Sequence, residues 1–304
     1  MKIVILDGET IHANDLNWDP LQRFGEVVVY DRSSYEESRQ RIAGAEIVIF
    51  SKIHMDRALI ASDPALRFCG VAATGFDNLD VAAARERGIA CTNVPAYATE
   101  AVAQHTIALL LELCNHIGLH NDSVHSDEWN EARGFCYWKK PLMLLAGKTI
   151  GIVGYGHIGR KVAEIAAALG MTVRVYRREP EAALAADVVS LHIPATPETV
   201  NFINAERIEK MKDGALLINT ARGTLVDEEA VAAALRSGKL GGFAADVLRR
   251  EPPSSDDPLI HMEQCVITPH NSWCPPETRR IICDTLADNI ESWLAGGSKN
   301  RIDL

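Results

Sequence analysis

The chain has 304 residues, of which 47% are hydrophobic, and its formal net charge at pH 7 is −10. This length exceeds what one ordinary core holds and predicts two domains, while the negative charge argues against nucleic acid or an anionic membrane as a partner. Seven cysteines without a CxxC pair argue against a disulfide framework or a zinc cluster. The apolar run at the start is too short for the apolar region of a signal peptide, so we expect none. We therefore expect a cytoplasmic protein that acts on a small molecule.

The first third of the chain alternates short apolar runs with segments of helical pattern. Short apolar runs between turn residues are typical of buried strands, and strands that alternate with helices form parallel sheets. The predicted strands of this part are residues 2–6, 27–30, 46–50, 67–73 and 89–93. The pattern predicts a doubly wound α/β domain.

A helix is predicted over residues 99–117, where Thr99 can serve as the N-cap and apolar residues cover most of the circumference. A helix of this kind has to be buried, so we expect it to join the two domains. The next segment, residues 120–142, has the least regular pattern of the chain. It is predicted to form an irregular loop.

A second series of apolar runs predicts another doubly wound parallel sheet. Its strands are expected at residues 149–154, 172–176, 187–193, 214–221, 241–247 and 265–270. The C-terminal segment begins with Pro275 and Pro276, has helical periodicity and stops at Gly296 and Gly297. Because a lone helix must dock, we expect it to return to the first domain. The predicted domains are residues 1–98 completed by 276–304, and residues 99–275.

Gly154, Gly156 and Gly159 form the pattern GxGxxG between a predicted strand and the helix-forming stretch KVAEIAAALG. Such glycines permit a tight turn and a close backbone approach, and the N–H groups at the start of the helix can bind a pyrophosphate. The pattern alone is often only a turn, but strand, pattern, helix and next strand in succession predict dinucleotide binding. The N-terminal strand lacks these glycines, so the nucleotide is expected in the second domain.

The residue expected to read the ribose lies about 20 residues past the glycine pattern, where an acidic side chain usually takes the 2′-hydroxyl. Arg177 stands at this place, with Arg178 beside it. A guanidinium pairs with a 2′-phosphate, whereas a carboxylate would repel it. NADP is therefore favoured over NAD. The alternative is that both arginines are solvated surface charges, with Glu179 neutralising one of them.

Three polar side chains follow predicted strands, where open α/β sheets place their ligands. They are Arg222 in INTARG, Glu251 in DVLRREP and His270 in ITPH. An arginine can hold a carboxylate with two hydrogen bonds, and a histidine beside a carboxylate can exchange a proton at neutral pH. Together they suit a 2-oxo acid as substrate, although each alone has an ordinary structural explanation.

The order of these motifs resembles the D-2-hydroxyacid dehydrogenase family. GxGxxG is followed by NTARGTLVDEEAVAAAL, a DVxxxEP element and TPH. The first domain, with GVAATGFDNLDVAAARERGIACTNVPAYATEAVAQHTIALLLELCNH, looks especially like the glycerate dehydrogenase or hydroxypyruvate reductase branch. The resemblance covers nearly the whole chain and implies a Rossmann cofactor domain inserted in a flavodoxin-like substrate domain.

By this resemblance, Arg222 binds the substrate carboxylate and polarises the C2 carbonyl. Glu251 orients the imidazole of His270 and favours its charged form. His270 protonates the carbonyl oxygen while a hydride arrives from the nicotinamide, and removes that proton in the reverse reaction. The other side of the carboxylate is expected to meet the backbone N–H groups of Ala73, Thr74 and Gly75.

The resemblance also implies further residues of the cofactor site. They are His157 and Ile158 at the pyrophosphate, Pro194 near the adenosine, Thr220 and Ala221 beside the nicotinamide, and Asp246 at its carboxamide. No metal is expected, because His157 and His192 lie in separate strand-end loops without a cluster of ligands around them.

One segment departs from the family pattern. Family members usually carry a longer connection after the second strand of the cofactor domain, often with a short edge strand, whereas here Arg178 is followed almost at once by EPEAALAADVV. The shortening should trim the adenosine side of the site. It could expose the ribose 2′-position or shift Arg177 out of register.

Trp138, in the segment FCYWKK, matches a tryptophan that in the related branch reaches across a dimer interface towards the neighbouring substrate site. The alternative is ordinary packing of an aromatic side chain under a loop. We expect a homodimer formed through the predicted helix over residues 99–117 and this loop, because that helix is too apolar to face water.

These features predict an NAD(P)H-dependent reductase that interconverts a small 2-oxo acid, hydroxypyruvate or glyoxylate, and its D-2-hydroxy acid. The alternative from another class is a non-catalytic, NAD(H)-sensing protein on the same fold, similar to the corepressors that resemble these enzymes. Phosphoglycerate dehydrogenase is less favoured, because the first domain has no basic cluster for a phosphate and the chain ends at Leu304 without a regulatory domain.

Overall fold

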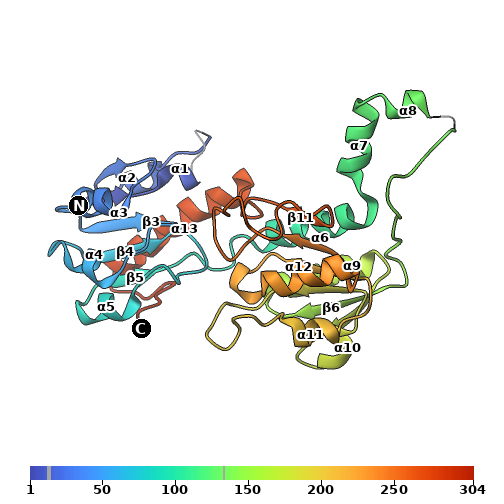
Figure 1. Ribbon diagram of the computed structural model, residues 1–304. Helices are drawn as coiled ribbons and strands as arrows, with labels where there is room; N and C mark the ends of the chain where they lie inside the picture. Colours follow the sequence, from blue (N-terminus) through green and yellow to red (C-terminus); the bar gives the residue numbers. More distant parts are fainter. Residues whose placement is uncertain (12–14, 133) are drawn as a thin grey trace. The chain divides into compact units, whose positions relative to one another are not determined.

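The computed structural model describes residues 1–11, 15–132 and 134–304, and it divides into two compact units (Figure 1). Unit 1 comprises Met1–Ala98 and Trp273–Leu304, and unit 2 comprises Thr99–Ser272. The second crossing therefore comes after Ser272 and not after residue 275 as predicted. The backbone N–H groups of Asn271 and Ser272 donate to the carboxylate of Asp246 in unit 2, which keeps these residues with that unit.

Unit 1 is a parallel sheet with helices on it, and its strand order is β2-β1-β3-β4-β5. Its elements are β1 (Lys2–Ile5), α1 (Gly8–Ile11), α2 (Asp19–Gln22), β2 (Glu26–Val29), α3 (Tyr35–Arg41), β3 (Ile47–Phe50), α4 (Arg57–Ala61), β4 (Phe68–Val71), α5 (Val81–Glu86), β5 (Ala90–Thr92) and α13 (Pro276–Leu294). This is the flavodoxin-like order, as predicted.

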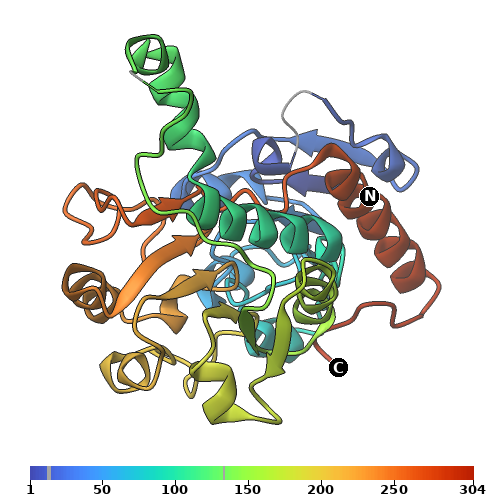
Figure 2. The ribbon, with the colours of Figure 1, turned by 90° about the vertical axis from the view of Figure 1, so that its right-hand side faces the viewer.

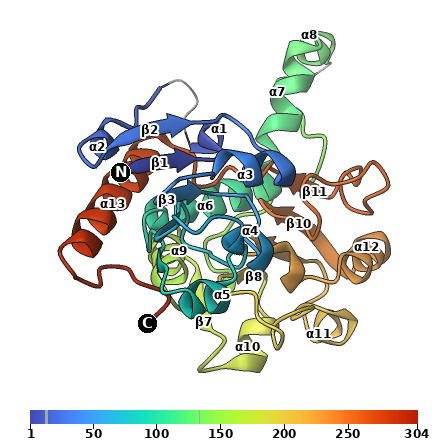
Figure 3. The same cartoon turned by 90° about the vertical axis from the view of Figure 1, so that its left-hand side faces the viewer.

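Burial explains the strand pattern of unit 1. Every residue of β3 and β4 is buried, because helices cover both faces of a parallel sheet, whereas the edge strand β2 is only partly buried. The C-terminal helix α13 packs on this unit and contacts α2 (Figure 3). Its Trp293 ring lies 5.1 Å from the ring of Phe68, measured between centroids, so α13 completes the core of unit 1.

Unit 2 has a second parallel sheet, with the order β11-β10-β9-β8-β6-β7. Its elements are α6 (Thr99–Asn115), α7 (Ile117–His125), α8 (Glu128–Glu131), β6 (Thr149–Val153), α9 (His157–Ala168), β7 (Thr172–Val175), α10 (Pro180–Leu184), β8 (Val188–Leu191), α11 (Ala205–Glu209), β9 (Ala215–Asn219), the 3-10 turn η1 (Gly223–Leu225), α12 (Glu228–Ser237), β10 (Leu240–Ala245) and β11 (Cys265–Ile267). The predicted α/β class with two doubly wound parallel sheets is confirmed.

The sheet of unit 2 ends at β7. Every residue of the connection from β7 to β8 is described, and this connection contains only the short helix α10, so it adds no strand beyond β7. A Rossmann sheet with the order 3-2-1-4-5-6 has one more strand at this edge. The shortened segment noted in the sequence therefore removes the outer strand next to the expected adenosine site.

Helix α6 starts at Thr99, so the residue predicted as its N-cap is its first helical residue. It packs against α9 and the sheet of unit 2 (Figure 2), and its apolar side chains join a core that includes Leu110, Ile150 and Val162. Full burial of such aliphatic side chains contributes about 1.5–3 kcal/mol each. The apolar surface of α6 is thus covered within unit 2, and the reason given above for a dimer through this helix is wrong.

The predicted end of this helix and the irregular region after it also differ from the structure. His116 has a left-handed backbone conformation, with φ +50°, which ends α6 and starts α7 in a new direction. Helices α7 and α8 lie where an irregular segment is predicted, and they extend away from the sheet of unit 2 (Figure 1). We call residues 117–144 the arm.

Among the described residues, none of the helices combines the length and the apolar character that crossing a membrane requires.

Candidate active site

Three neighbouring strands of unit 2 carry the predicted catalytic residues. Arg222 follows β9, Glu251 follows β10 and His270 follows β11, and these strands are adjacent in the order β11-β10-β9. The carboxyl ends of parallel strands lie at one edge of the sheet. The sheet therefore brings all three residues to the same edge of unit 2.

His270 and Glu251 are in direct contact. The Nδ1 atom of His270 lies 2.6 Å from Oε2 of Glu251, and the other carboxylate oxygen accepts the N–H of Leu248 at 3.0 Å. Both side chains are partly buried, with 26% and 35% of their surfaces exposed. A carboxylate on Nδ1 holds the ring in one orientation and leaves Nε2 as the nitrogen that can exchange a proton with a ligand.

The turn that carries Arg222 is held by Asn219, a residue that sequence reasoning missed. The Asn219 side chain accepts the N–H of Ala221 at 3.1 Å and donates to the carbonyl of Arg222 at 2.8 Å, and it is fully buried. The signal in the sequence is its place at the end of a buried strand, where an amide can cap the next turn.

Gly223 is a second residue that was missed. A Cβ atom at this position would lie 1.9 Å from the backbone carbon of Leu248, so only glycine lets the two chain segments approach this closely. Leu248 is also the residue whose N–H binds Glu251. The contact thus joins the turn of Arg222 to the loop of Glu251, which sequence spacing alone does not reveal.

The glycine pattern forms a cradle at the start of α9. Gly154 has φ +99°, and a Cβ there would lie 2.4 Å from the carbonyl oxygen of His192. A Cβ at Gly159 would lie 2.0 Å from the carbonyl oxygen of Gly154, whereas Gly156 faces open space. Gly156 is the N-cap of α9, and no described side chain caps the first N–H groups of the helix. This geometry fits the pyrophosphate of a dinucleotide.

His192 supports the cradle from the end of β8. Its backbone N–H donates to Val153 at 2.6 Å, and its ring Nε2 lies 2.9 Å from the hydroxyl of Ser190. Burial lowers the pKa of His192 to about 4. The imidazole is therefore neutral at physiological pH and serves as a hydrogen-bonding group of the framework.

The predicted ribose-binding position lies at the end of β7. Arg177 is exposed there. The guanidinium carbon of Arg178 lies 5.8 Å from the ring centroid of Tyr155, the residue between the first two glycines of the cradle. Glu179 pairs with Arg174 at 2.9 Å. The carboxylate that was considered a partner of Arg177 or Arg178 is therefore engaged elsewhere, and the guanidinium of Arg178 lies at the edge of the cradle.

The other predicted cofactor residues lie at strand ends of unit 2. His157 and Ile158 open α9, Pro194 follows β8, and Thr220 and Ala221 follow β9. Asp246, expected at the nicotinamide carboxamide, has only 1% of its surface exposed. Its carboxylate accepts the hydroxyl of Thr268 and the N–H groups of Asn271 and Ser272. These three donors thus all belong to the segment that contains His270.

The predicted carboxylate-binding loop follows β4 in unit 1. Its shape is set by Asn93 and Val94, because Asn93 donates its side-chain amide to the carbonyl of Thr74 at 2.7 Å and the Val94 N–H donates to Ala73 at 3.0 Å. Among the described residues, the N–H groups of Ala73, Thr74 and Gly75 meet no acceptor. Consecutive N–H groups of this kind can bind an anion.

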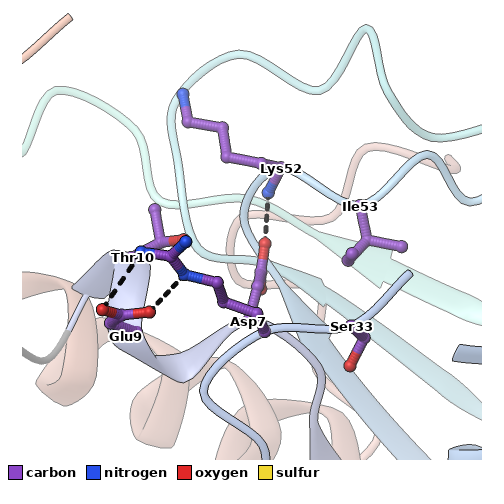
Figure 4. A pocket seen from close by; sticks show the side chains of 7 residues that line it. Asp7, Glu9, Thr10, Ser33, Lys52 and Ile53 are labelled. Atoms are coloured by element: carbon purple, nitrogen blue, oxygen red, sulfur yellow. Dashed lines mark hydrogen bonds and ion pairs between the residues drawn. The ribbon is translucent and has the colours of Figure 1, made fainter. Parts of the chain in front are cut away.

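Unit 1 also has a depression of about 450 Å³ at the carboxyl ends of β1 and β3 (Figure 4). It is lined by Asp7, Glu9, Thr10, Arg32, Ser33, Lys52 and Ile53. Burial raises the pKa of Asp7, whose carboxylate accepts the N–H groups of Ser51 and Lys52 at 2.9 and 2.6 Å. The charges of two acidic side chains, Asp7 and Glu9, are matched in this lining by those of two basic side chains, Arg32 and Lys52. The depression therefore lacks the net positive charge of a carboxylate site.

Trp138 lies on the arm with 69% of its surface exposed. The segment around it is tied to α7, because Tyr137 shares a hydrogen bond of 2.6 Å with Ser123 and the Lys139 N–H donates to His120 at 3.1 Å. Trp138 also lines a mainly apolar groove of about 300 Å³ on the arm. These hydrogen bonds hold the backbone around Trp138 in place, while the Trp138 indole stays exposed to solvent.

Comparison with known proteins agrees with this geometry. Residues 107–272, more than half of the chain, match the family model described as D-isomer specific 2-hydroxyacid dehydrogenase, NAD binding domain. The chain is 42% identical to a hydroxypyruvate reductase of Blautia hydrogenotrophica, with 100% of each chain covered. It is 38% identical to a glycerate dehydrogenase of Methylorubrum extorquens, with 99% of each covered.

A solved structure extends the comparison to the fold. An acyclic imino acid reductase, Bsp5, in complex with NADPH and D-Arg, matches with a TM-score of 0.86 and 27% identity over 99% of this chain and 100% of that one. These matches confirm the resemblance seen in the motifs. The family model also confirms the predicted nucleotide-binding domain, and its range contains Arg222, Glu251 and His270. The chain belongs to the family of D-isomer-specific 2-hydroxyacid dehydrogenases.

Proposed function

We propose that the protein is an NADP-preferring reductase that converts a small 2-oxo acid, hydroxypyruvate or glyoxylate, into its D-2-hydroxy acid, and that the reaction is reversible. The observation that carries this proposal is the contact between His270 and Glu251, at the same sheet edge as Arg222, in a unit built for a dinucleotide. Relatives named for hydroxypyruvate, glycerate and glyoxylate support the substrate class.

The proposed roles follow from the chemistry of each group. Arg222 binds the substrate carboxylate, and the N–H groups of residues 73–75 bind it as well. His270 delivers a proton from Nε2 to the carbonyl oxygen, and Glu251 stabilises the imidazolium and its orientation. A bound reduced nicotinamide supplies the hydride. The residues proposed to hold this cofactor are Gly154, Gly156, His157, Ile158, Gly159, Arg177, Pro194, Thr220, Ala221 and Asp246.

The test of this function is a panel of 2-oxo acids assayed with NADPH and with NADH, following the loss of reduced-cofactor absorbance. We expect turnover of hydroxypyruvate or glyoxylate and a D-configured product by chiral chromatography. The alternative, a protein that only senses the nucleotide, predicts binding of NADPH or NADH without turnover of any oxo acid. Binding without turnover by the purified chain would contradict the proposed reaction.

The preference for NADP is supported by the position of Arg177 and by the engagement of Glu179 with Arg174. We expect kcat/KM to be higher with NADPH than with NADH. Arg177→Ala should lower kcat/KM with NADPH by about tenfold to a hundredfold, because a hydrogen bond to a charged group contributes about 1.5–3 kcal/mol, and should leave the value with NADH nearly unchanged.

Arg178→Ala is the matched control for this prediction, since Arg178 carries the same charge and lies over Tyr155. A smaller loss with NADPH than for Arg177→Ala is expected. A wild-type preference for NADH, or equal losses with both cofactors in Arg177→Ala, would contradict the assignment of Arg177 to the 2′-phosphate.

We propose a homodimer in which a second copy of the chain covers the arm. Several apolar side chains of the arm are exposed: Ile117, Val124, Trp129, Phe135, Trp138, Leu142 and Leu144. A surface of this kind is typical of an interaction site. Trp138 is then available to reach the substrate site of the second copy.

Light scattering should give the mass of a dimer for the wild type. Phe135→Glu, at a side chain with 92% of its surface exposed, should shift the protein to monomer because it places a charge in the apolar interface. Val200→Glu, at an exposed apolar residue outside the arm, is the control and should stay dimeric. A monomeric wild type, or an unchanged mass for Phe135→Glu, would refute the arm as the interface.

The proposed location is the cytoplasm. It is supported by the seven cysteines, all of which are free thiols in the described part of the chain.

A further inference from the structure

Helix α6 contacts the strands that lead to the catalytic residues. It packs on β9, β10 and β11, which continue into the segments of Arg222, Glu251 and His270 (Figure 1). Most of this contact is apolar. Two consecutive polar residues of α6, His105 and Thr106, interrupt it, and each forms a hydrogen bond to one of the catalytic segments.

The segment of His270 needs support from outside itself. His270 has a left-handed backbone conformation, with φ +52°, and such a conformation costs about 1–3 kcal/mol for a residue other than glycine. Asp246 provides the support. Its Oδ1 accepts the Thr268 hydroxyl at 2.7 Å and the Asn271 N–H at 2.9 Å, and its Oδ2 accepts the Ser272 N–H at 2.9 Å. The carboxylate thus holds the chain on both sides of His270.

His105 extends this support to α6. Its Nε2 lies 2.9 Å from the hydroxyl oxygen of Thr268. The single hydroxyl hydrogen of Thr268 points to the carboxylate of Asp246, so the oxygen must accept from His105, which therefore carries a hydrogen on Nε2. The result is a relay of donors from His105 through Thr268 to Asp246. It connects α6 to the anchor of the His270 segment.

Thr106 makes the corresponding contact to the segment of Arg222. Its hydroxyl donates to the carbonyl of Val102 at 2.7 Å, so at 2.8 Å it accepts the hydroxyl hydrogen of Thr220. Both threonines are buried, with 1% and 8% of their surfaces exposed. Thr220 lies two residues before Arg222, in the turn that Asn219 caps.

We propose that His105 and Thr106 are positioning residues, which together set the separation of His270 and Arg222. The inference rests on the proposed function. Apolar packing alone lets a helix slide by fractions of an ångström, whereas two directed hydrogen bonds from neighbouring residues define one register of α6 against the two segments. A displacement of about 1 Å in such a site can cost about a hundredfold in rate.

The first experiment is a double-mutant cycle on the relay. His105→Leu removes the donor, and Thr268→Val removes the hydroxyl while keeping its shape. Each should lower kcat by about 10- to 100-fold and leave the affinity for NADPH and the KM for the oxo acid nearly unchanged. Because both break the same relay, the double variant should be no slower than the worse single variant. His105→Gln, which keeps a donor, should recover most of the loss.

A readout without turnover accompanies the cycle. Amide hydrogen exchange should become faster at Asn271 and Ser272 in His105→Leu, because their N–H groups bind the carboxylate that the relay holds. Thr106→Val tests the second hydrogen bond. It should chiefly raise the KM for the oxo acid, because Thr106 contacts the segment that carries Arg222. Thr92→Val is the control: its buried hydroxyl has no partner among the described residues, so kinetics and exchange should match the wild type.

The relay would be overturned if the fold losses of kcat in the two single variants multiplied in the double variant. It would also be overturned if His105→Gln recovered none of the kcat lost in His105→Leu. Unchanged exchange at residues 271 and 272 would overturn it as well, whether or not the protein turns over. A fall in Tm with unchanged kcat would show a structural role only. A wild type that reduces no 2-oxo acid would instead refute the proposed function. The exchange measurement would still test the relay, because it does not require turnover.

Discussion

His270→Gln should lower kcat by about 10²–10⁴-fold with every 2-oxo acid that the wild type reduces, while NADPH binding stays near the wild-type value. Glutamine can still accept or donate a hydrogen bond, but it cannot deliver a proton to a carbonyl oxygen at neutral pH. The cradle around Gly154 and Gly156 is formed by a different part of unit 2, so the cofactor should bind as before. Steady-state rates and fluorescence titration with NADPH measure the two quantities.

Two further variants show whether the loss belongs to the imidazole. Glu251→Gln keeps a side chain at Nδ1 of His270 and should lower kcat less than His270→Gln does. His261→Gln changes an exposed histidine before β11 and should behave like the wild type. A rate near that of the wild type for His270→Gln would contradict its role in proton transfer.

Arg222→Ala should raise the KM for the oxo acid and lower kcat/KM by about a hundredfold or more. A charge-assisted hydrogen bond contributes about 1.5–3 kcal/mol, and a guanidinium can make two of them to one carboxylate. The turn around Arg222 is held by Asn219 and by the contact of Gly223 with Leu248, so it should keep its shape in the variant. The KM for NADPH should change little.

Added guanidinium ion should restore part of the activity of Arg222→Ala, since the truncated side chain leaves room for it. Arg222→Lys should fall between wild type and Arg222→Ala, because lysine keeps the charge and loses the fork of donors. Arg236→Ala removes an exposed arginine of α12 and controls for the change in net charge. An unchanged KM for the oxo acid in Arg222→Ala would exclude this residue from carboxylate binding.

Much of the fold follows from the sequence because the strands of a parallel sheet are buried on both faces. The apolar runs at residues 46–50 and 187–193 contain β3 and β8, whose residues are all buried, with their ends shifted by a few residues. The arm was not predicted. Helices α7 and α8 are short, and their sequences have no clear apolar periodicity that would predict a helix. Their direction depends on the left-handed backbone conformation of His116, which the sequence pattern does not indicate.

The candidate site was predictable in its residue types and only partly in its contacts. His270 and Glu251 could be paired because both follow strands of one parallel sheet and have complementary chemistry. The approach of Gly223 to Leu248 and the hydrogen bonds of His105 and Thr106 join positions far apart in the chain. The first depends on how the segments after β9 and β10 approach each other, and the others depend on how α6 crosses the sheet, and a local pattern carries no information about either.

Among the described residues no strand pairs with the outer side of β7, so the backbone of β7 is an open edge of the sheet. An open edge can pair with the edge of another molecule and start aggregation, and charged side chains in the edge strand are a common protection. Arg174 lies within β7, and Arg177 and Arg178 follow it closely. The positive charge that is proposed to hold a phosphate therefore also discourages strand-to-strand association between molecules.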